Sequence, residues 1–334
     1  MAYYTQAISG HVSLMMRSEP VADVLQQPDT PPALSRALSS AQSARTFAKH
    51  TLKLPVGGAF SNFVALEHPW VVVNLVAVPE FSLTPNQWCY PFVGCQAYRG
   101  YFKLAMAKEA QKHFDNQGYD TFIGAVTAYS TLGWFDDPLH TGFTNLSEDR
   151  MIALMFHELA HRVVYLSGDT AFNESFATAV ELEGLRLWLK REGQPEVFER
   201  ALLRLEHRNR TLELVRDTSE TLQRLYEQQS TLSHEQLRQR KQQILDDLAS
   251  QYAALAAHYP GPGPLGAAPV QLNNAKLALF QQYNQHVPAF RQLLKDVDFD
   301  FERFYEAVSR LAEQPQTARE DTLKALSKRF HEHL

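Results

Sequence analysis

The chain has 334 residues, of which 45% are hydrophobic and 21% are charged, and its formal net charge at pH 7 is −5. This composition is ordinary for a globular protein and excludes a largely disordered chain. The negative charge gives no general attraction to nucleic acid or to an anionic membrane surface. Because the sequence also has no convincing basic patch, we expect no nucleic-acid partner.

No segment predicts a transmembrane helix. The first residues, MAYYTQAISGHVSLMM, lack the basic segment and the apolar run of a signal peptide. No window approaches the roughly eighteen unbroken apolar residues that a membrane-spanning helix needs. We therefore expect a soluble chain, although a chain trimmed of its targeting segment would show the same features.

The first third of the chain predicts helices that lead into a small sheet. Residues 20–55 alternate proline-marked turns with helical pieces rich in Ala and Leu, and VVVNLVAV at 71–78 predicts a buried strand. The apolar spacing of residues 98–120 predicts a helix of about four turns. TFIGAVTAY at 121–129 predicts a further strand, and the loop STLGWFDDPL leaves it.

The chain has two cysteines, Cys89 and Cys95. A disulfide between them would close a short loop, and a single local pair is typical of proteins from an oxidising compartment. The alternative is two free buried thiols in a cytosolic protein. Zinc binding by this pair is not expected, because no second cysteine pair completes a four-cysteine site.

The stretch FHELAHRVVYLSGDTAFNESFA at 156–177 combines His-Glu-x-x-His with an Asn-Glu pair twelve residues later. A helix is expected over 147–166, because Ser147 can cap its start and Gly168 can end it. A second helix is expected over about 170–193. The two helices would form a tight hairpin.

This hairpin would present a metal site. His157 and His161 lie on one face of the first helix and can direct their imidazole nitrogens to one ion, while Glu158 lies about 100° further round. Glu174, from the second helix, would complete the set. Three protein ligands leave a fourth position of a zinc ion for water, and Glu158 could take the proton from this water. The alternative is a buried helix that carries the pattern by chance.

The neighbouring residues are consistent with a buried site. Leu154 and Val164 share the histidine face, so this face is expected to point into the protein. On the second helix, Thr178 and Glu181 share the face of Glu174 and could accept hydrogen bonds from the histidine N–H groups. For Glu181 the alternative is a solvent-exposed carboxylate.

The remainder of the chain predicts helices. Residues 197–257 predict two long antiparallel helices with a new cap at Ser233; a DNA-binding basic region is less consistent, because acidic residues are interleaved throughout. PGPGPLGAAP at 260–269 predicts a loop. We expect an α+β fold that is mostly helical, with a zincin-like helix pair beside a small mixed sheet. The expected domains are a catalytic region (1–195), a long helical hairpin (196–257) and a C-terminal helical region (258–334).

HELAH, followed by NESFA, resembles the gluzincin peptidases, in which a downstream Glu, commonly in Asn-Glu-x-x-Ala, completes the site. The spacer between the two motifs is shorter here. The chain resembles more closely a family of bacterial zinc aminopeptidases, over most of residues 3–190 and more weakly at LNNAKLALFQQYNQHVPAF. The motifs that carry this resemblance are YYTQAISGH, GCQAYRGYF, AYSTLGWFDDPL, FHELAHRVVY and GDTAFNESFA.

The resemblance implies a zinc cofactor with His157, His161 and Glu174 as ligands, Glu158 as general base, and a peptide substrate. Many members of the family that the chain resembles begin with a lipoprotein-type signal just before the first motif. The resemblance therefore implies a lipid anchor in the full-length form, and, together with the cysteine pair, the periplasmic side of a bacterial envelope.

One departure concerns the amino terminus of the substrate. Aminopeptidase N-like enzymes carry a Gly-x-Met-Glu-Asn strand whose Glu binds the free amine, whereas GAVTAYSTLG has no carboxylate there. Asp136 or Asp137 could substitute, and the alternative is that both form a turn before Pro138. An extended substrate is expected to pair with residues 124–130 as an added strand.

A donor is also needed for the oxyanion of the transition state. Tyr129, at the end of the predicted strand, is the first candidate. Tyr98, His258 and Tyr283 are further candidates, and for each of the four the alternative is an ordinary core or surface residue.

We therefore expect a zinc metallopeptidase, an aminopeptidase that acts on short peptides. One alternative is a non-catalytic zinc-containing envelope protein, although a structural site would not need Glu158. The other is an endopeptidase or amidase with the same metal centre. The long hairpin at 196–257 could cover the cleft, bind a partner or only pack.

Overall fold

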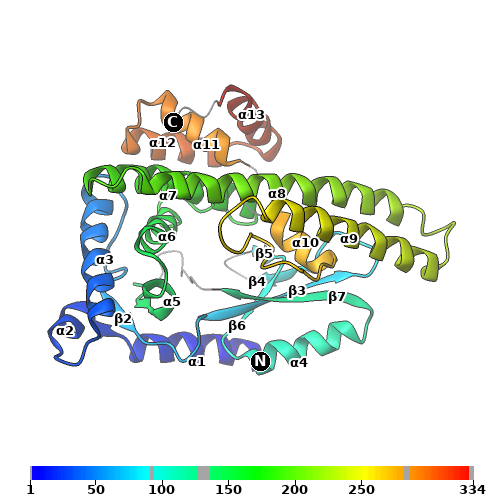
Figure 1. Cartoon of the computed structure of the whole chain (residues 1–334), viewed down its shortest axis with the longest axis horizontal. Helices are drawn as coiled ribbons and strands as arrows, with labels where there is room; N and C mark the ends of the chain where they lie inside the picture. Colours follow the sequence, from blue (N-terminus) through cyan, green and yellow to red (C-terminus); the bar gives the residue numbers. More distant parts are fainter. Residues whose placement is uncertain (1, 91–93, 127–135, 282–285, 331–334) are drawn as a thin grey trace. The chain divides into compact units, whose positions relative to one another are not determined.

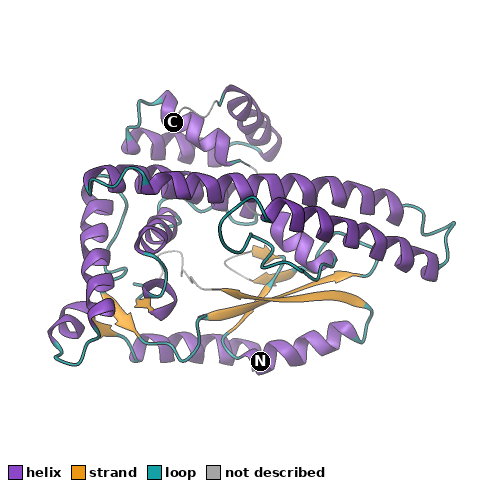
Figure 2. Ribbon diagram, viewed as in Figure 1, coloured by secondary structure: helices purple, strands orange, loops and turns teal. Residues whose placement is uncertain are grey.

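The computed structural model describes residues 2–90, 94–126, 136–281 and 286–330, which form 13 helices and three small sheets (Figure 1). The predicted fold class, a mostly helical α+β protein, is confirmed, and Figure 2 separates the helices from the few strands. Within these described ranges, none of the helices combines the length and the apolar character that crossing a bilayer requires.

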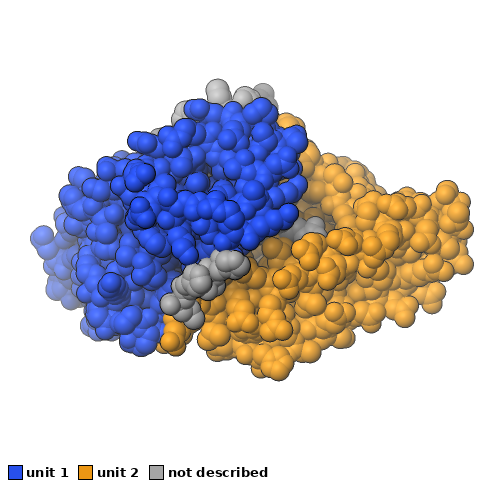
Figure 3. Space-filling model, turned by 90° about the horizontal axis from the view of Figure 1, so that it is seen from above, with its two compact units in different colours: residues 1–72, 126–198, 284–334 blue, residues 73–125, 199–283 orange. Residues whose placement is uncertain are grey.

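The chain forms two compact units, which Figure 3 colours separately. Each unit is assembled from segments that lie far apart in the sequence. The three consecutive regions expected from the sequence are not tested by this division and stay a prediction. Unit 1 contains Met1–Val72, Val126–Phe198 and Asn284–Leu334, and unit 2 contains Val73–Ala125 and Glu199–Tyr283.

Unit 1 is built around the helix pair α6 (Glu148–Ala160) and α7 (Thr170–Arg191), which pack closely against each other. Gly184 of α7 allows this approach, because a Cβ atom there would lie 2.8 Å from side-chain atoms of both Phe156 and Leu52. Further helices of this unit are α1 (Ala2–Met16), α2 (Val21–Gln26), α3 (Pro32–His50) and α5 (Thr141–Thr144).

The C-terminal helices also belong to unit 1. Their aromatic side chains pack on the first turns of α7, where Phe290 lies edge-on to Phe172 at 5.1 Å and to Phe176 at 5.8 Å between ring centroids. All three rings are completely buried. The three helices are α11 (Val287–Asp296), α12 (Phe301–Ala312) and α13 (Gln316–Arg329).

A small mixed sheet in unit 1 holds the segment that precedes α5. Its strand order is β1-β2-β8; β1 and β2 are antiparallel, and β2 and β8 are parallel. The chain just before β8 is also held, because the carbonyl of Asp137 accepts a hydrogen bond from Phe60 N at 2.8 Å. The strands are β1 (Glu19–Pro20), β2 (Asn62–Val64) and β8 (Leu139–His140).

Unit 2 contains the sheet β6-β3-β7. The predicted strand in VVVNLVAV is its buried central strand β3 (Val72–Pro79), and the next predicted strand is found as β7 (Tyr119–Val126). The helix predicted from residue 98 begins later, as α4 (Leu104–Asp115). The residues before it form β6 (Arg99–Tyr101), because they pair antiparallel with β3.

A disulfide joins Cys89 and Cys95, so the predicted bond is confirmed and the alternative of two free thiols is wrong. The two cysteines face each other across the antiparallel strands β4 (Trp88–Tyr90) and β5 (Gly94–Gln96). The bond therefore links the two strands covalently. An isolated pair of strands is only marginally stable without such a link.

The predicted pair of long helices is confirmed as α8 (Val197–Tyr226) and α9 (His234–Ala256), which run side by side in Figure 1. Ser233 caps α9 as predicted, in a reciprocal capping box with Gln236. The loop that follows α9 is held by Tyr252, whose hydroxyl donates to Gly266 O at 2.7 Å. The short helix α10 (Asn274–Gln281) completes this unit.

Candidate metal centre

The histidine motif lies at the end of α6. Residue 161 is the C-cap and keeps helical dihedral angles (φ −61°, ψ −18°), so His157 and His161 share one face as predicted. The helix ends at Ala160 and not at 166, because Arg162 N and Val163 N bond to the carbonyls three residues earlier and tighten the last turn. Ser147 occupies the N-cap position but makes no side-chain capping bond.

The connection to α7 is fixed by specific hydrogen bonds. Gly168 has a φ of 82°, which favours glycine, and Asp169 caps α7 by accepting from Phe172 N at 3.0 Å. The side chain of Asn173 accepts from Leu166 N and donates to Leu166 O, each at 2.8 Å. This amide bridge ties the loop to the residue just before Glu174, a role that the sequence did not reveal.

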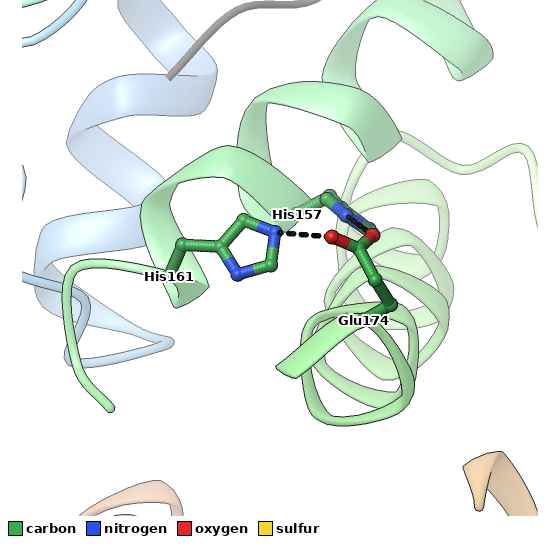
Figure 4. A group of neighbouring side chains, drawn as sticks. All are labelled: His157, His161 and Glu174. Atoms are coloured by element: carbon green, nitrogen blue, oxygen red, sulfur yellow. Dashed lines mark hydrogen bonds and ion pairs between the residues drawn. The ribbon is translucent and has the colours of Figure 1, made fainter. Parts of the chain in front are cut away.

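Three side chains converge between the two helices, and Figure 4 shows the carboxylate of Glu174 between the two imidazole rings. The Nε2 of His157 lies 3.3 Å from Oε2 of Glu174, and the Nε2 of His161 lies 3.7 Å from Oε1. One potential ligand atom from each residue lies within 4.8 Å of the others. The side chains are 13%, 8% and 21% exposed, respectively.

These residues fit a zinc ion. Nδ1 of His157 pairs with Glu181 Oε2 at 3.0 Å, so a proton on Nδ1 leaves the lone pair of Nε2 directed toward Glu174. Nδ1 of His161 is buried and has no hydrogen-bond partner among the described residues. Two imidazoles and one carboxylate are a donor set that zinc takes at catalytic sites with an open fourth position.

Of the two roles considered for Glu181, the structure favours the hydrogen-bond acceptor over the exposed carboxylate, because this side chain is 30% exposed and contacts His157. Burial lowers the pKa of His157, but hydrogen bonds to Glu174 and Glu181 outweigh it and raise the pKa well above its ordinary value. Burial lowers the pKa of His161 to about 4. A metal ion would therefore displace a proton from His157.

Glu158 stands beside the histidines and is half-buried. Burial raises the pKa of its carboxyl to about 7; a charged His157 opposes this shift, and the negative charges of Glu174 and Asp137 add to it. A carboxylate with a pKa near neutrality can both accept and return a proton at physiological pH, which is what a general base that later acts as an acid requires.

The two aspartates before Pro138 have different surroundings. Asp136 is 56% exposed and accepts a hydrogen bond from Gly58 N at 3.0 Å, and it also lies 3.5 Å from Nη2 of Arg162. Asp137 is buried, and its charge acts on the pKa of Glu158. The pair is therefore more than a turn: one aspartate holds a loop, and the other contributes to the electrostatics of the site.

None of the four candidate oxyanion donors belongs to the described residues of unit 1, which hold this cluster. Tyr129 and Tyr283 lie outside the described residues, as do residues 127–130 of the predicted substrate-pairing strand. In unit 2, Tyr98 packs on an apolar cluster that includes Val76, and His258 is exposed. The role of each candidate as an oxyanion donor stays a prediction.

A family model described as "Putative aminopeptidase" matches residues 2–323, nearly the whole chain. Neither a curated protein nor a solved structure matches it.

Proposed function

The chain belongs to the putative aminopeptidase family, and from this premise we propose that it is a zinc-dependent peptidase that removes residues from the amino terminus of short peptides. The observation that carries the proposal is the convergence of His157, His161 and Glu174 on one point. Glu158 follows His157 in the helix and lies near enough for the charges of His157 and Glu174 to act on its carboxyl pKa. A purely structural site would need the three ligands but not the fourth residue.

In this proposal the side chains have separate roles. A zinc ion held by His157, His161 and Glu174 would act as a Lewis acid toward the scissile carbonyl and the attacking water. Glu158 accepts a proton from the water at its carboxylate and passes it to the leaving amine. Glu181 holds the Nδ1 proton of His157 and so orients this ring.

Exopeptidase specificity requires a group that binds the free amine of the substrate. The charge of Asp137 acts on the carboxyl of Glu158, so this aspartate lies near the proposed base. We therefore assign the amine to Asp137. The rival function is an endopeptidase or amidase with the same metal centre, in which Asp137 would only adjust the pKa of Glu158.

We also propose that the protein works on the periplasmic side of a bacterial envelope, with a lipid anchor in its full-length form. The Cys89–Cys95 disulfide supports an oxidising compartment. Mass spectrometry of the protein from its native host, with and without detergent extraction, would test the anchor directly.

The decisive experiment starts with elemental analysis of protein purified without a polyhistidine tag. About one zinc per chain is expected, because one His-His-Glu set is present in the described residues. The zinc-loaded protein is then incubated with matched short peptides whose amino terminus is free or acetylated. Cleavage of the free peptides alone supports the aminopeptidase, and equal cleavage of both supports the endopeptidase. Absence of zinc after dialysis against zinc would overturn both functions.

A further inference from the structure

The helix that carries Glu174 is held from a distant part of the chain. Arg319 of α13 is buried, with a side chain that is 8% exposed, and its Nη2 donates to Oδ2 of Asp169 at 3.0 Å. The two residues are 150 positions apart in the sequence. Because Asp169 is the N-cap of α7, this ion pair fixes the start of the helix from the C-terminal segment.

Each oxygen of Asp169 has its own partner. Oδ1 accepts from Phe172 N, which caps the helix, and Oδ2 accepts from the guanidinium of Arg319. Arg319 is itself constrained, because its Nη1 donates to Gln314 O at 2.9 Å and its guanidinium lies 5.8 Å from the ring centroid of Phe172. Because the guanidinium of Arg319 is itself held in place, it fixes the orientation of the Asp169 carboxylate.

A second contact holds the same two turns. The backbone N–H of His286 donates to the hydroxyl of Ser175 at 3.0 Å. Phe172 and Phe176 pack on Phe290 from the side of α7 that lies about 160° round the helix from Glu174. The C-terminal segment therefore packs on the side of α7 opposite to Glu174, whose carboxylate faces the histidines.

We propose that Arg319 is a positioning residue for the metal ligand Glu174, an inference that rests on the proposed zinc function. Glu174 lies five residues beyond the N-cap, so its carboxylate moves if the first turn of α7 frays or rotates. Without the ion pair the metal-free protein samples more positions of this carboxylate. Zinc binding must then order it, which weakens the affinity.

The test measures the zinc dissociation constant of the metal-free protein by competition with a chromophoric chelator. In the R319Q variant the zinc affinity should fall by about three- to tenfold, somewhat less than the loss for partners that touch a ligand directly. D169N is the second variant, because Asn retains the cap on Phe172 N and loses the carboxylate that pairs with Arg319. The double variant should lose no more affinity than either single variant.

R329Q is the matched control. Arg329 lies on the same helix and pairs with Asp296 at 2.8 Å, but the pair joins α13 to α11 and does not reach α7. Urea unfolding of each metal-free variant separates positioning from general stability. A zinc affinity that falls in R319Q and D169N, but not in R329Q, supports the proposal, and partial recovery in R319K strengthens it.

Three results would overturn the proposal. The first is a wild-type zinc affinity in both R319Q and D169N, whatever their stability. The second is an equal loss of affinity in R329Q, which would mean a general effect of the C-terminal segment. The third, failure of the wild-type protein to bind zinc, would overturn the proposed function as well and is thereby distinguished from the other two. If R319Q fails to fold, D169N alone decides between these outcomes.

Discussion

Two buried polar clusters of this protein differ in how well their charges are matched. In unit 2, Lys241 pairs with Asp120 at 2.7 Å and donates to Glu80 O at 2.9 Å, and Tyr226 donates to Asn274 at 2.8 Å. In unit 1, carboxylates gather around two imidazoles, and one buried ring nitrogen has no partner among the described residues.

The difference distinguishes a polar cluster that stabilises the fold from one that can bind a cation. Buried polar groups that satisfy one another stabilise a fold, whereas an excess of acceptors in one place needs a cation or a proton from outside. The first cluster is complete as folded. The second is balanced only by a proton on His157 or by a metal ion, so the two clusters should respond differently to substitution.

The largest effect is expected for Glu158→Gln. Removing the general base should lower the rate of peptide hydrolysis by about 10² to 10⁴ while zinc stays bound, since Glu158 is not a ligand. Steady-state kinetics and elemental analysis of the same preparation check both halves. Full activity in this variant would contradict the proposed role of the carboxylate.

Glu174→Ala should remove one of the three ligands and weaken zinc binding by more than about a hundredfold. This loss exceeds the one expected when a residue that only hydrogen-bonds to a ligand is replaced. The measurement is again chelator competition. Glu192→Ala, on the exposed C-cap of the same helix, is the control and should bind zinc normally. An unchanged affinity in Glu174→Ala would exclude this residue from the site.

Lys241→Met tests the other cluster. It leaves Asp120, whose side chain is 16% exposed, without its cation, so the free energy of unfolding should fall by about 3 kcal/mol. Zinc affinity should not change, because none of the proposed ligands lies in this cluster. Urea denaturation and chelator competition give the two values, and a loss of zinc affinity would show that the two clusters are coupled.

Glu181→Ala should lower zinc affinity by about 10- to 100-fold, because the His157 ring loses the acceptor that orients it. Glu181→Gln, which keeps an acceptor oxygen, should recover part of this loss. Equal affinities in all three proteins would mean that the contact between His157 and Glu181 has no role in metal binding.

The local parts of this site could be predicted from the sequence. His157 and His161 follow from helical spacing, and the cap at Asp169 with a glycine before it places Glu174 on the return helix. The role of Glu181 stayed open, because the face of a helix is defined by spacing but its neighbour is defined by packing. The early end of α6 depends on a tightened last turn, which propensity alone does not reveal.

The contacts that span long stretches of sequence were not predictable. Arg99–Tyr101 has no strong strand pattern of its own and becomes a strand because β3 offers hydrogen-bonding partners. Arg319 has no local signal either, since its partner lies 150 residues earlier. In both cases the conformation is selected by tertiary context, which overrides local preference.

The packing of Phe172 and Phe176 on Phe290 has a consequence for the order of events on the ribosome. The whole histidine motif is synthesised before α11 (Val287–Asp296), more than a hundred residues earlier in the chain. A chain that has not yet reached α11 therefore carries the motif without the helices that support α7. The metal centre is therefore completed late in biosynthesis. A truncated product would keep the histidine motif but would lack the helices that pack on α7.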